Sequence, residues 1–307
     1  MRERFPQASV ARQAFTLIEL MVVLVIVAIL SSLTLAGLAD SQRNSKAAKT
    51  RSTIRKLHEI IVPHYENFLR RRVPLQPPNP PPAPRWTAAE VALDRLNRIR
   101  TLTLYEMPDS WADVAMTGTA STLVSGSAIP SYAWTGVTRS YGAYREARTA
   151  TLSPQHRSAE CLFAIVSRGQ LEPDVLSQFR QDELGDTDAD NAQEFVDGWG
   201  RPISFMRWPT GFVAPNSMIQ VDDPVNRHDP LDPFRQELAA FALTPLVYSA
   251  GPDGEDGIVQ LSSWTGQTLT ALFSVTNGAS PPQRPGAPTT AVTTARDNIT
   301  NHDLTTK

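Results

Sequence analysis

The chain has 307 residues, a net charge of −2 and a pI near 6.2, and it contains a single cysteine. It has no basic domain and no interleaving of basic with aromatic residues, which argues against nucleic-acid binding. The lone cysteine excludes an intramolecular disulfide, and Cys161 lies in an apolar helical stretch, so we expect a buried, inert thiol. The histidines form no recognisable nucleophile and base arrangement with Cys161, and we predict that the protein is not an enzyme.

The N-terminus combines a basic leader with a long apolar run. Residues 1–14 carry three arginines and one glutamate, and residues 15–39 have no charge except Glu19. At about 1.5 Å per residue, a helix over residues 15–39 is long enough to cross a hydrocarbon core of about 30 Å. Because positive charge stays on the cytoplasmic side, we predict a cytoplasmic N-terminus and an external remainder. A carboxylate in such a span costs about 2.5–3.5 kcal/mol near the centre, so Glu19 calls for a cationic partner.

The residues alone leave three interpretations of this segment open. A secretory signal peptide would be cut after the apolar run, where Ala36–Ala39 offers a weak A-x-A-like site. An ordinary signal anchor would keep the helix and carry Glu19 by chance. Cleavage before the run would also leave the helix on the mature protein.

The segment Ala14–Leu20 (Ala-Phe-Thr-Leu-Ile-Glu-Leu) resembles the prepilin signature of type IV pilins and type II secretion pseudopilins. In that family a membrane prepilin peptidase cuts a basic leader before a Phe, and the new amine is N-methylated. The resemblance implies cleavage between Ala14 and Phe15, methylation of Phe15, and an assembly role for Glu19. The family usually has Gly where this chain has Ala14. Since Ala is the next smallest residue, cleavage is still expected.

The resemblance implies a structural subunit of a type II secretion pseudopilus or a type IV pilus-like filament. Its partners would be prepilin peptidase, other pilin or pseudopilin subunits and an inner-membrane assembly platform. The protein would sit in the inner membrane with its C-terminal domain in the periplasm, and then in the filament. The amine of Phe15 would pair with Glu19 of the same or a neighbouring subunit. The alternative is a membrane-anchored extracytoplasmic binding module that uses a pilin-type anchor.

The predicted fold is α+β, with a long N-terminal helix packed on a small antiparallel sheet and with a helical insertion. The predicted parts are a leader (1–14), a transmembrane helix (15–39), a periplasmic continuation of the spine helix (40–73), a Pro-rich linker (74–85), a helical and loop insertion (86–194) and a pseudopilin-like β region with a calcium loop (195–307).

Local patterns predict further elements. An apolar stripe at helical spacing carries the first helix beyond the membrane, and Pro63 marks a kink or an end. Thr87 and Glu90 have the spacing of a capping box before a helix over residues 88–104. Residues 117–140 are rich in Gly, Ser and Thr and indicate a surface loop.

Another helix is expected to begin at Ser153-Pro154 and to stop at Gly169. Residues 203–208 and 246–249 have β-like patterns. Two tryptophans, Trp199 and Trp208, are expected to pack the sheet against the long helix, although a binding surface is the alternative.

Three C-terminal blocks give a second resemblance. Residues 197–203 (Asp-Gly-Trp-Gly-Arg-Pro-Ile), 247–257 and 297–301 are similar to blocks of the major pseudopilin of type II secretion. In that family the last two blocks hold a Ca²⁺ ion that fastens the C-terminal loop to the sheet.

The resemblance implies a Ca²⁺ site at Asp253, Asp256 and Asp297. Ca²⁺ takes six to eight hard oxygen ligands, and carboxylates among turn-forming glycines suit it. The alternative is a Gly/Asp-rich turn without a metal.

A second acidic cluster has the spacing of a Ca²⁺ loop at positions 1, 3, 5, 9 and 12. Its members are Asp186, Asp188, Asp190, Glu194 and Asp197. It departs from the pattern at Asn191, where Gly is usual, and at Asp197, where Glu is usual. Because Asn tolerates the left-handed conformation, a second Ca²⁺ site is possible here, and an acidic solvated loop is the alternative.

Overall fold

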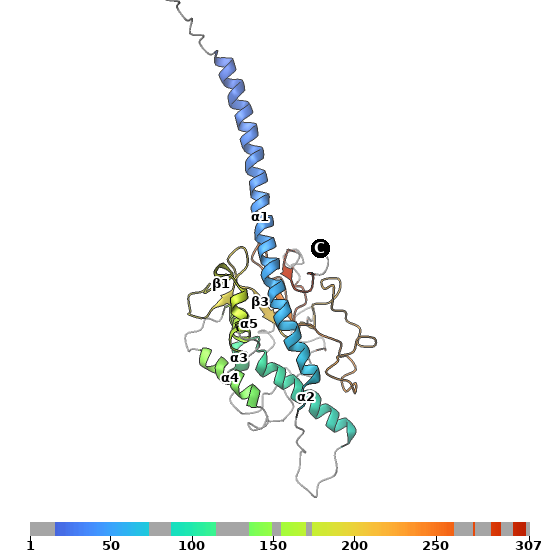
Figure 1. The fold of residues 1–307 in the computed structure, drawn as a ribbon. Coiled ribbons are helices and arrows are strands. Elements are labelled where there is room, and N and C mark those ends of the chain that lie inside the picture. The colour runs from blue at the N-terminus through green and yellow to red at the C-terminus, as the bar shows by residue number, and fades with distance from the viewer. Residues whose placement is uncertain are drawn as a thin grey trace, which may run out of the picture. The chain divides into compact units, whose positions relative to one another are not determined.

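The computed structural model describes residues 16–73, 87–114, 135–148, 155–169, 174–260, 273, 284–289 and 297–304. Its α-helices are α1 (Leu17–Arg70), α2 (Ala88–Glu106), α3 (Trp111–Val114), α4 (Thr135–Ala147) and α5 (Arg157–Arg168) (Figure 1). Two 3₁₀ turns, η2 (Val175–Gln178) and η3 (Gln181–Glu183), precede the strands β1 (Leu184–Gly185), β2 (Glu194–Phe195), β3 (Ser204–Met206), β4 (Leu246–Ser249) and β5 (Ile299–Thr300). The chain divides into two compact units, residues 1–45 and 46–307.

The first unit contains the apolar part of α1. Its large apolar side chains are between 50% and 77% exposed: Leu17, Ile18, Leu20, Met21, Val22, Val23, Leu24, Val25, Ile26, Val27, Ile29, Leu30, Leu35 and Leu38. By length and apolar character together, no helix in the described part of the chain qualifies as able to cross a membrane. The assignment of residues 15–39 to a membrane therefore stays a prediction.

The second unit holds a three-stranded antiparallel sheet in the order β3-β4-β5. Phe205 of β3 faces Val247 of β4, and Tyr248 of β4 faces Thr300 of β5. A separate two-stranded pair joins β1 to β2, with Leu184 opposite Phe195. The α+β class and the antiparallel sheet agree with the prediction, and β5 places the C-terminal segment beside β4.

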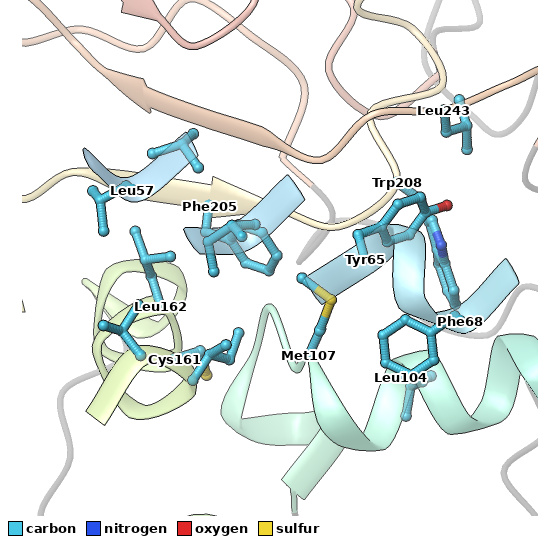
Figure 2. Close-up of a cluster of buried hydrophobic side chains, with 14 of the residues drawn as sticks. Leu57, Tyr65, Phe68, Leu104, Met107, Cys161, Leu162, Phe205, Trp208 and Leu243 are labelled. Carbon is cyan, nitrogen blue, oxygen red and sulfur yellow. The ribbon is translucent and has the colours of Figure 1, made fainter. Parts of the chain in front are cut away.

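The larger of two hydrophobic clusters among the described residues runs through the second unit (Figure 2). The late turns of α1 contribute Leu57, Tyr65 and Phe68, and the sheet region contributes Phe205 and Trp208. Helices α2 and α5 close the core from the insertion. At about 25 cal/mol per Å² of buried apolar surface, this shared core is the main favourable term for the unit. Residues on both sides of position 194 therefore belong to one packed body.

Several predicted helix signals are confirmed. Thr87 Oγ1 accepts a hydrogen bond from Glu90 N, and the Glu90 carboxylate accepts one from Thr87 N, which is the predicted capping box. The helix extends two residues beyond 104, to Glu106. Helix α5 stops at Gly169, whose N–H bonds Ile165 O. The thiol of Cys161 is fully buried, and burial raises its pKa.

Other local predictions were wrong, and tertiary packing explains each difference. The alternative of a helix end at Pro63 was wrong, whereas the predicted continuation of the spine helix towards residue 73 agrees with an end at Arg70; Tyr65 and Phe68 of the last turns are buried in the core. The predicted loop 117–140 ends in helix, since α4 starts at Thr135 and its Tyr144 is buried and donates to Glu106 O. Residues 117–134 of that loop lie outside the described residues.

The start of α5 also differs from the prediction. The helix begins at Arg157, with the backbone carbonyl of His156 accepting from Ala159 N and Glu160 N. The predicted start at Ser153-Pro154 and the linker 74–85 lie outside the described residues. Trp208 is buried as expected, whereas Trp199 is only half-buried.

Buried charge pairs fix the layers of the second unit. Arg100 bonds Asp229 at 3.0 Å and Glu237 at 2.6 Å, which ties α2 to the loop before β4. Lys56 of α1 pairs with Glu183 at 2.7 Å. Breaking a buried pair by removing one partner costs about 3–5 kcal/mol, so these contacts define which surfaces meet.

His302 is buried near β5 and is held neutral. Its Nδ1 lies 2.8 Å from Ser217 Oγ and its Nε2 lies 3.2 Å from Thr244 O. Since a carbonyl only accepts, Nε2 carries the proton and Nδ1 accepts from the serine hydroxyl. Burial lowers the pKa of His302 to about 4.

We expect acid to destabilise the protein through His302. Burial of the neutral imidazole contributes fully to the free energy of unfolding above pH 6.5, the pKa of an unperturbed histidine. That contribution falls by about 2–3 kcal/mol as the pH falls towards 4. Chemical denaturation at pH 7 and 4.5 should show a larger loss for wild type than for His302→Gln. Parallel losses in the two proteins would contradict this assignment.

Candidate functional site

The start of α1 is closed by a second capping box. Thr16 N and Thr16 Oγ1 donate to Glu19 Oε2 at 2.9 and 2.8 Å, and Glu19 N donates to Thr16 Oγ1 at 3.3 Å. Ala14 and Phe15 lie outside the described residues. The Glu19 carboxylate therefore accepts from the backbone of Thr16, the residue that directly follows the predicted amine of Phe15. The sequence prediction had given Glu19 a charge-pairing role alone.

The first C-terminal block forms a tight turn built on Asp197. Its Oδ1 accepts from Trp199 N and Arg201 N at 2.8 and 2.9 Å, and its Oδ2 accepts from Ser249 Oγ at 2.7 Å. Asp197 is 1% exposed, so its carboxylate is committed to the turn and to β4. Asp197 therefore has a structural role in the turn, and it does not join the other acids of the predicted second Ca²⁺ loop.

The turn also touches α1 through Gly198. Gly198 N donates to Thr50 Oγ1 at 2.9 Å, and a Cβ on this glycine would lie 2.2 Å from Lys46 O. Only a residue without a side chain permits this approach of turn to helix.

The predicted C-terminal ligands lie near one another without sharing a centre. Asp256 Oδ2 accepts from Gln260 Nε2 at 2.6 Å, and Asp253 Oδ1 accepts from Glu255 N at 2.9 Å. Asp297 Oδ1 is buried without a hydrogen-bond partner among the described residues. Among those residues, the groups of three acidic or histidine side chains that could share an ion do not include this trio. Calcium at this loop stays a prediction.

The second acidic cluster is split by the structure and extended by two residues. Asp186 accepts from Asp190 N and Asn191 N at 3.2 and 3.0 Å, so it holds the loop. The three remaining acids meet side chains from the start of α5, and the resulting groups, each with ligand atoms within 4.8 Å of one another, are His156, Asp188 and Glu194, and Glu160, Asp188 and Asp190.

The joined cluster is buried and rich in negative charge. Glu160 is 1% exposed and Glu194 is fully buried. Burial raises the pKa of Glu160 to about 7, with the charges of Asp190 and Asp188 adding to the rise. Burial also raises the pKa of Glu194 to about 7, and Asp188 contributes again. An uncompensated buried carboxylate costs on the order of several kcal/mol, so the cluster as it stands is unfavourable at neutral pH.

Sequence reasoning missed Glu160 and His156 as members of this cluster. The available signal was Glu160 itself, a carboxylate inside the apolar stretch Ala159–Val166. A charge on the buried face of a helix calls for a partner, and the partner here lies in another element.

A pocket of about 530 Å³ borders the cluster and the C-terminal loop. The residues that line it include His156, Thr187, Arg201 and Asp256. It therefore gives access from the surface to the edge of the acidic cluster.

The comparisons with known proteins concern the N-terminus. Residues 10–35 match the family model of the prokaryotic N-terminal methylation motif, the signature of pilins and pseudopilins. No curated protein and no solved structure matches the chain. The motif indicates a pilin-type substrate of prepilin peptidase, a structural subunit, and a location in a membrane or a filament. The likeness of the C-terminal blocks to the major pseudopilin stays a prediction.

Proposed function

We propose that this chain is a structural subunit of a type II secretion pseudopilus or a type IV pilus-like filament. The observation that carries the proposal is the methylation motif at residues 10–35. It overlaps the exposed apolar surface of α1, which extends from Leu17 to Leu38. Large, contiguous exposed apolar patches mark sites of interaction with proteins or membranes. Neighbouring copies of α1, or lipid before assembly, would cover it.

Within this proposal the inner membrane holds the protein before assembly. The basic leader stays cytoplasmic, the peptidase cuts between Ala14 and Phe15, and the second unit lies in the periplasm. Mass spectrometry of the membrane-extracted protein should give a mature chain that begins at N-methylated Phe15. A mature chain that still begins at Met1, or one that begins beyond residue 36, would contradict the proposal.

Glu19 offers a test that separates two roles of the same carboxylate. Glu19→Ala removes both the charge and the capping contacts with Thr16, whereas Glu19→Gln keeps acceptors for the cap and removes only the charge. If charge pairing with a neighbouring amine drives assembly, both variants should lose filament incorporation. Thr16→Ala, which weakens the cap and keeps the charge, is the matched control and should still assemble.

The outcomes distinguish the alternatives. Normal assembly of Glu19→Gln with failure of Glu19→Ala would assign Glu19 to capping rather than to subunit pairing. Membrane retention of a correctly processed protein that never enters a filament, wild type included, would favour the anchored binding module instead.

A further inference from the structure

We propose that Glu160, Asp188, Asp190 and Glu194 bind one calcium ion that joins helix α5 to the loop between β1 and β2 and to the start of β2. This site differs from the C-terminal loop of Asp253, and it does not depend on the proposed filament function. Its ligands come from a helix and from a loop and strand that follow some 25 residues later in the chain. Sequence spacing alone would not combine them.

Asp188 links two overlapping groups of side chains that could hold a cation. Asp188 belongs to both groups of side chains whose ligand atoms lie within 4.8 Å of one another, once with His156 and Glu194 and once with Glu160 and Asp190. Asp188 is therefore within reach of Glu194 and also of Glu160 and Asp190. A single divalent cation bound there would contact carboxylates from both elements.

Several oxygens around Asp188 accept no hydrogen bond among the described residues. Both carboxylate oxygens of Asp188, Oε1 of Glu160 and Oε1 of Glu194 are buried and lack a hydrogen-bond partner among the described residues. The outer oxygens are bound: Trp111 Nε1 donates to Glu160 Oε2, and Thr187 N donates to Glu194 Oε2. Each glutamate is thus held by one oxygen while the other is available to a cation. Buried charges are normally paired or coordinate metals, and a cation is the missing partner here.

The loop is shaped before any ion binds. Ala189 and Asn191 have positive φ angles of 61° and 71°, and Asp186 accepts from two backbone N–H groups of the loop. Asp190 Oδ1 accepts from Ala192 N at 2.9 Å. These contacts fix where the acidic side chains project, so binding need not order a flexible segment.

The ligand chemistry selects calcium over softer metals. Four carboxylates supply hard oxygens and negative charge, and Ca²⁺ accepts irregular geometry completed by carbonyls or water. His156 Nδ1 lies 3.8 Å from Asp188 Oδ2 and 3.9 Å from Glu194 Oε1, but it lies within 2.8 Å of Thr187 Oγ1. The imidazole is therefore engaged by the hydroxyl and stays at the edge of the calcium site.

The test is to titrate the full chain in detergent with Ca²⁺ and to follow binding by calorimetry. Thermal melting is then measured with and without Ca²⁺. Wild type should bind calcium and melt at a higher temperature with it. Asp188→Asn should bind one calcium ion fewer than wild type, or bind that ion at least tenfold more weakly. Asp253→Asn is the matched control from the C-terminal loop and should keep that ion. Unchanged binding by Asp188→Asn, or no calcium effect on wild type, would overturn the site.

Two further measurements guard against a folding artefact and a wrong metal. In EGTA, Glu160→Gln should melt no lower than wild type, because it removes an unpaired buried charge; a lower melting temperature contradicts the site. Tb³⁺ bound at the site should luminesce on tryptophan excitation, and Trp111→Phe should lose most of that emission. Tighter binding of Zn²⁺ that His156→Ala abolishes would overturn the assignment to calcium.

Discussion

Arg207→Met is expected to destabilise the second unit by about 3–5 kcal/mol at pH 7 or above. The guanidinium is 1% exposed and lies 3.2 Å from Asp113 Oδ2 and 3.5 Å from Asp109 Oδ1. It also donates to Met107 O at 2.6 Å and stacks 4.1 Å from the centre of the Trp208 ring. Methionine fills similar space but leaves two carboxylates buried without a cation.

The loss should depend on pH in a defined direction. Burial raises the pKa of Asp109 to about 7, Asp113 adds to the rise, and Arg207 opposes it. A raised carboxyl pKa gives stability that is present at low pH and lost as pH rises through 7. Urea denaturation should therefore find a smaller deficit for Arg207→Met at pH 5 than at pH 8.

Two companion variants make this result interpretable. Arg168→Met, on the exposed end of α5, should change stability by no more than about 0.5 kcal/mol. The triple variant Arg207→Met, Asp109→Asn, Asp113→Asn should recover most of the loss, because it removes the uncompensated charges. If the triple variant is as unstable as Arg207→Met, lost packing rather than buried charge is the cause.

Gly198→Ala is the second variant with a large expected effect. The new methyl would lie 2.2 Å from Lys46 O and 2.7 Å from Lys46 Cα. Both atoms belong to the backbone of α1, which cannot yield as a flexible side chain could. Overpacking of this kind costs about 1–3 kcal/mol, and the bond from Gly198 N to Thr50 Oγ1 would be strained as well.

Gly142→Ala supplies the matched control. Gly142 lies within α4 and has nothing within 4 Å of the position a Cβ would take. Since Gly in a helix interior costs about 0.5–1 kcal/mol relative to Ala, this substitution should stabilise the protein. Thermal melting should move the two variants in opposite directions, and a neutral Gly198→Ala would refute the close approach of the turn to α1.

Much of the helical architecture could be predicted from sequence because its signals are local. The capping box of Thr87 and Glu90 and the stop at Gly169 each depend on contacts three or four residues apart. The apolar stripe of Ile54, Leu57 and Ile61 is likewise buried as its spacing predicts. Helix α4 was missed because distant packing partners stabilise it against weak local preference.

The candidate sites also differ in whether local sequence or distant contacts define them. Residues 10–35 carry a methylation motif that a short stretch of sequence defines completely, since a peptidase reads a linear segment. The acidic residues after 185 were visible as a group, but spacing could not show that Asp186 and Asp197 bond backbone amides while Glu160 joins the others. A side chain's partners across the chain depend on which elements pack together, and spacing does not encode that.

By itself, the sequence determined the pilin-type N-terminus, the α+β class, the capping box of Thr87 and the helix stop at Gly169, because each depends on patterns of neighbours along the chain. Only the tertiary structure decided which carboxylates converge on Asp188, which arginine lies between Asp109 and Asp113, and where Gly198 meets α1. Burial sets the energy of a charge, and burial exists only after distant segments have packed into one core.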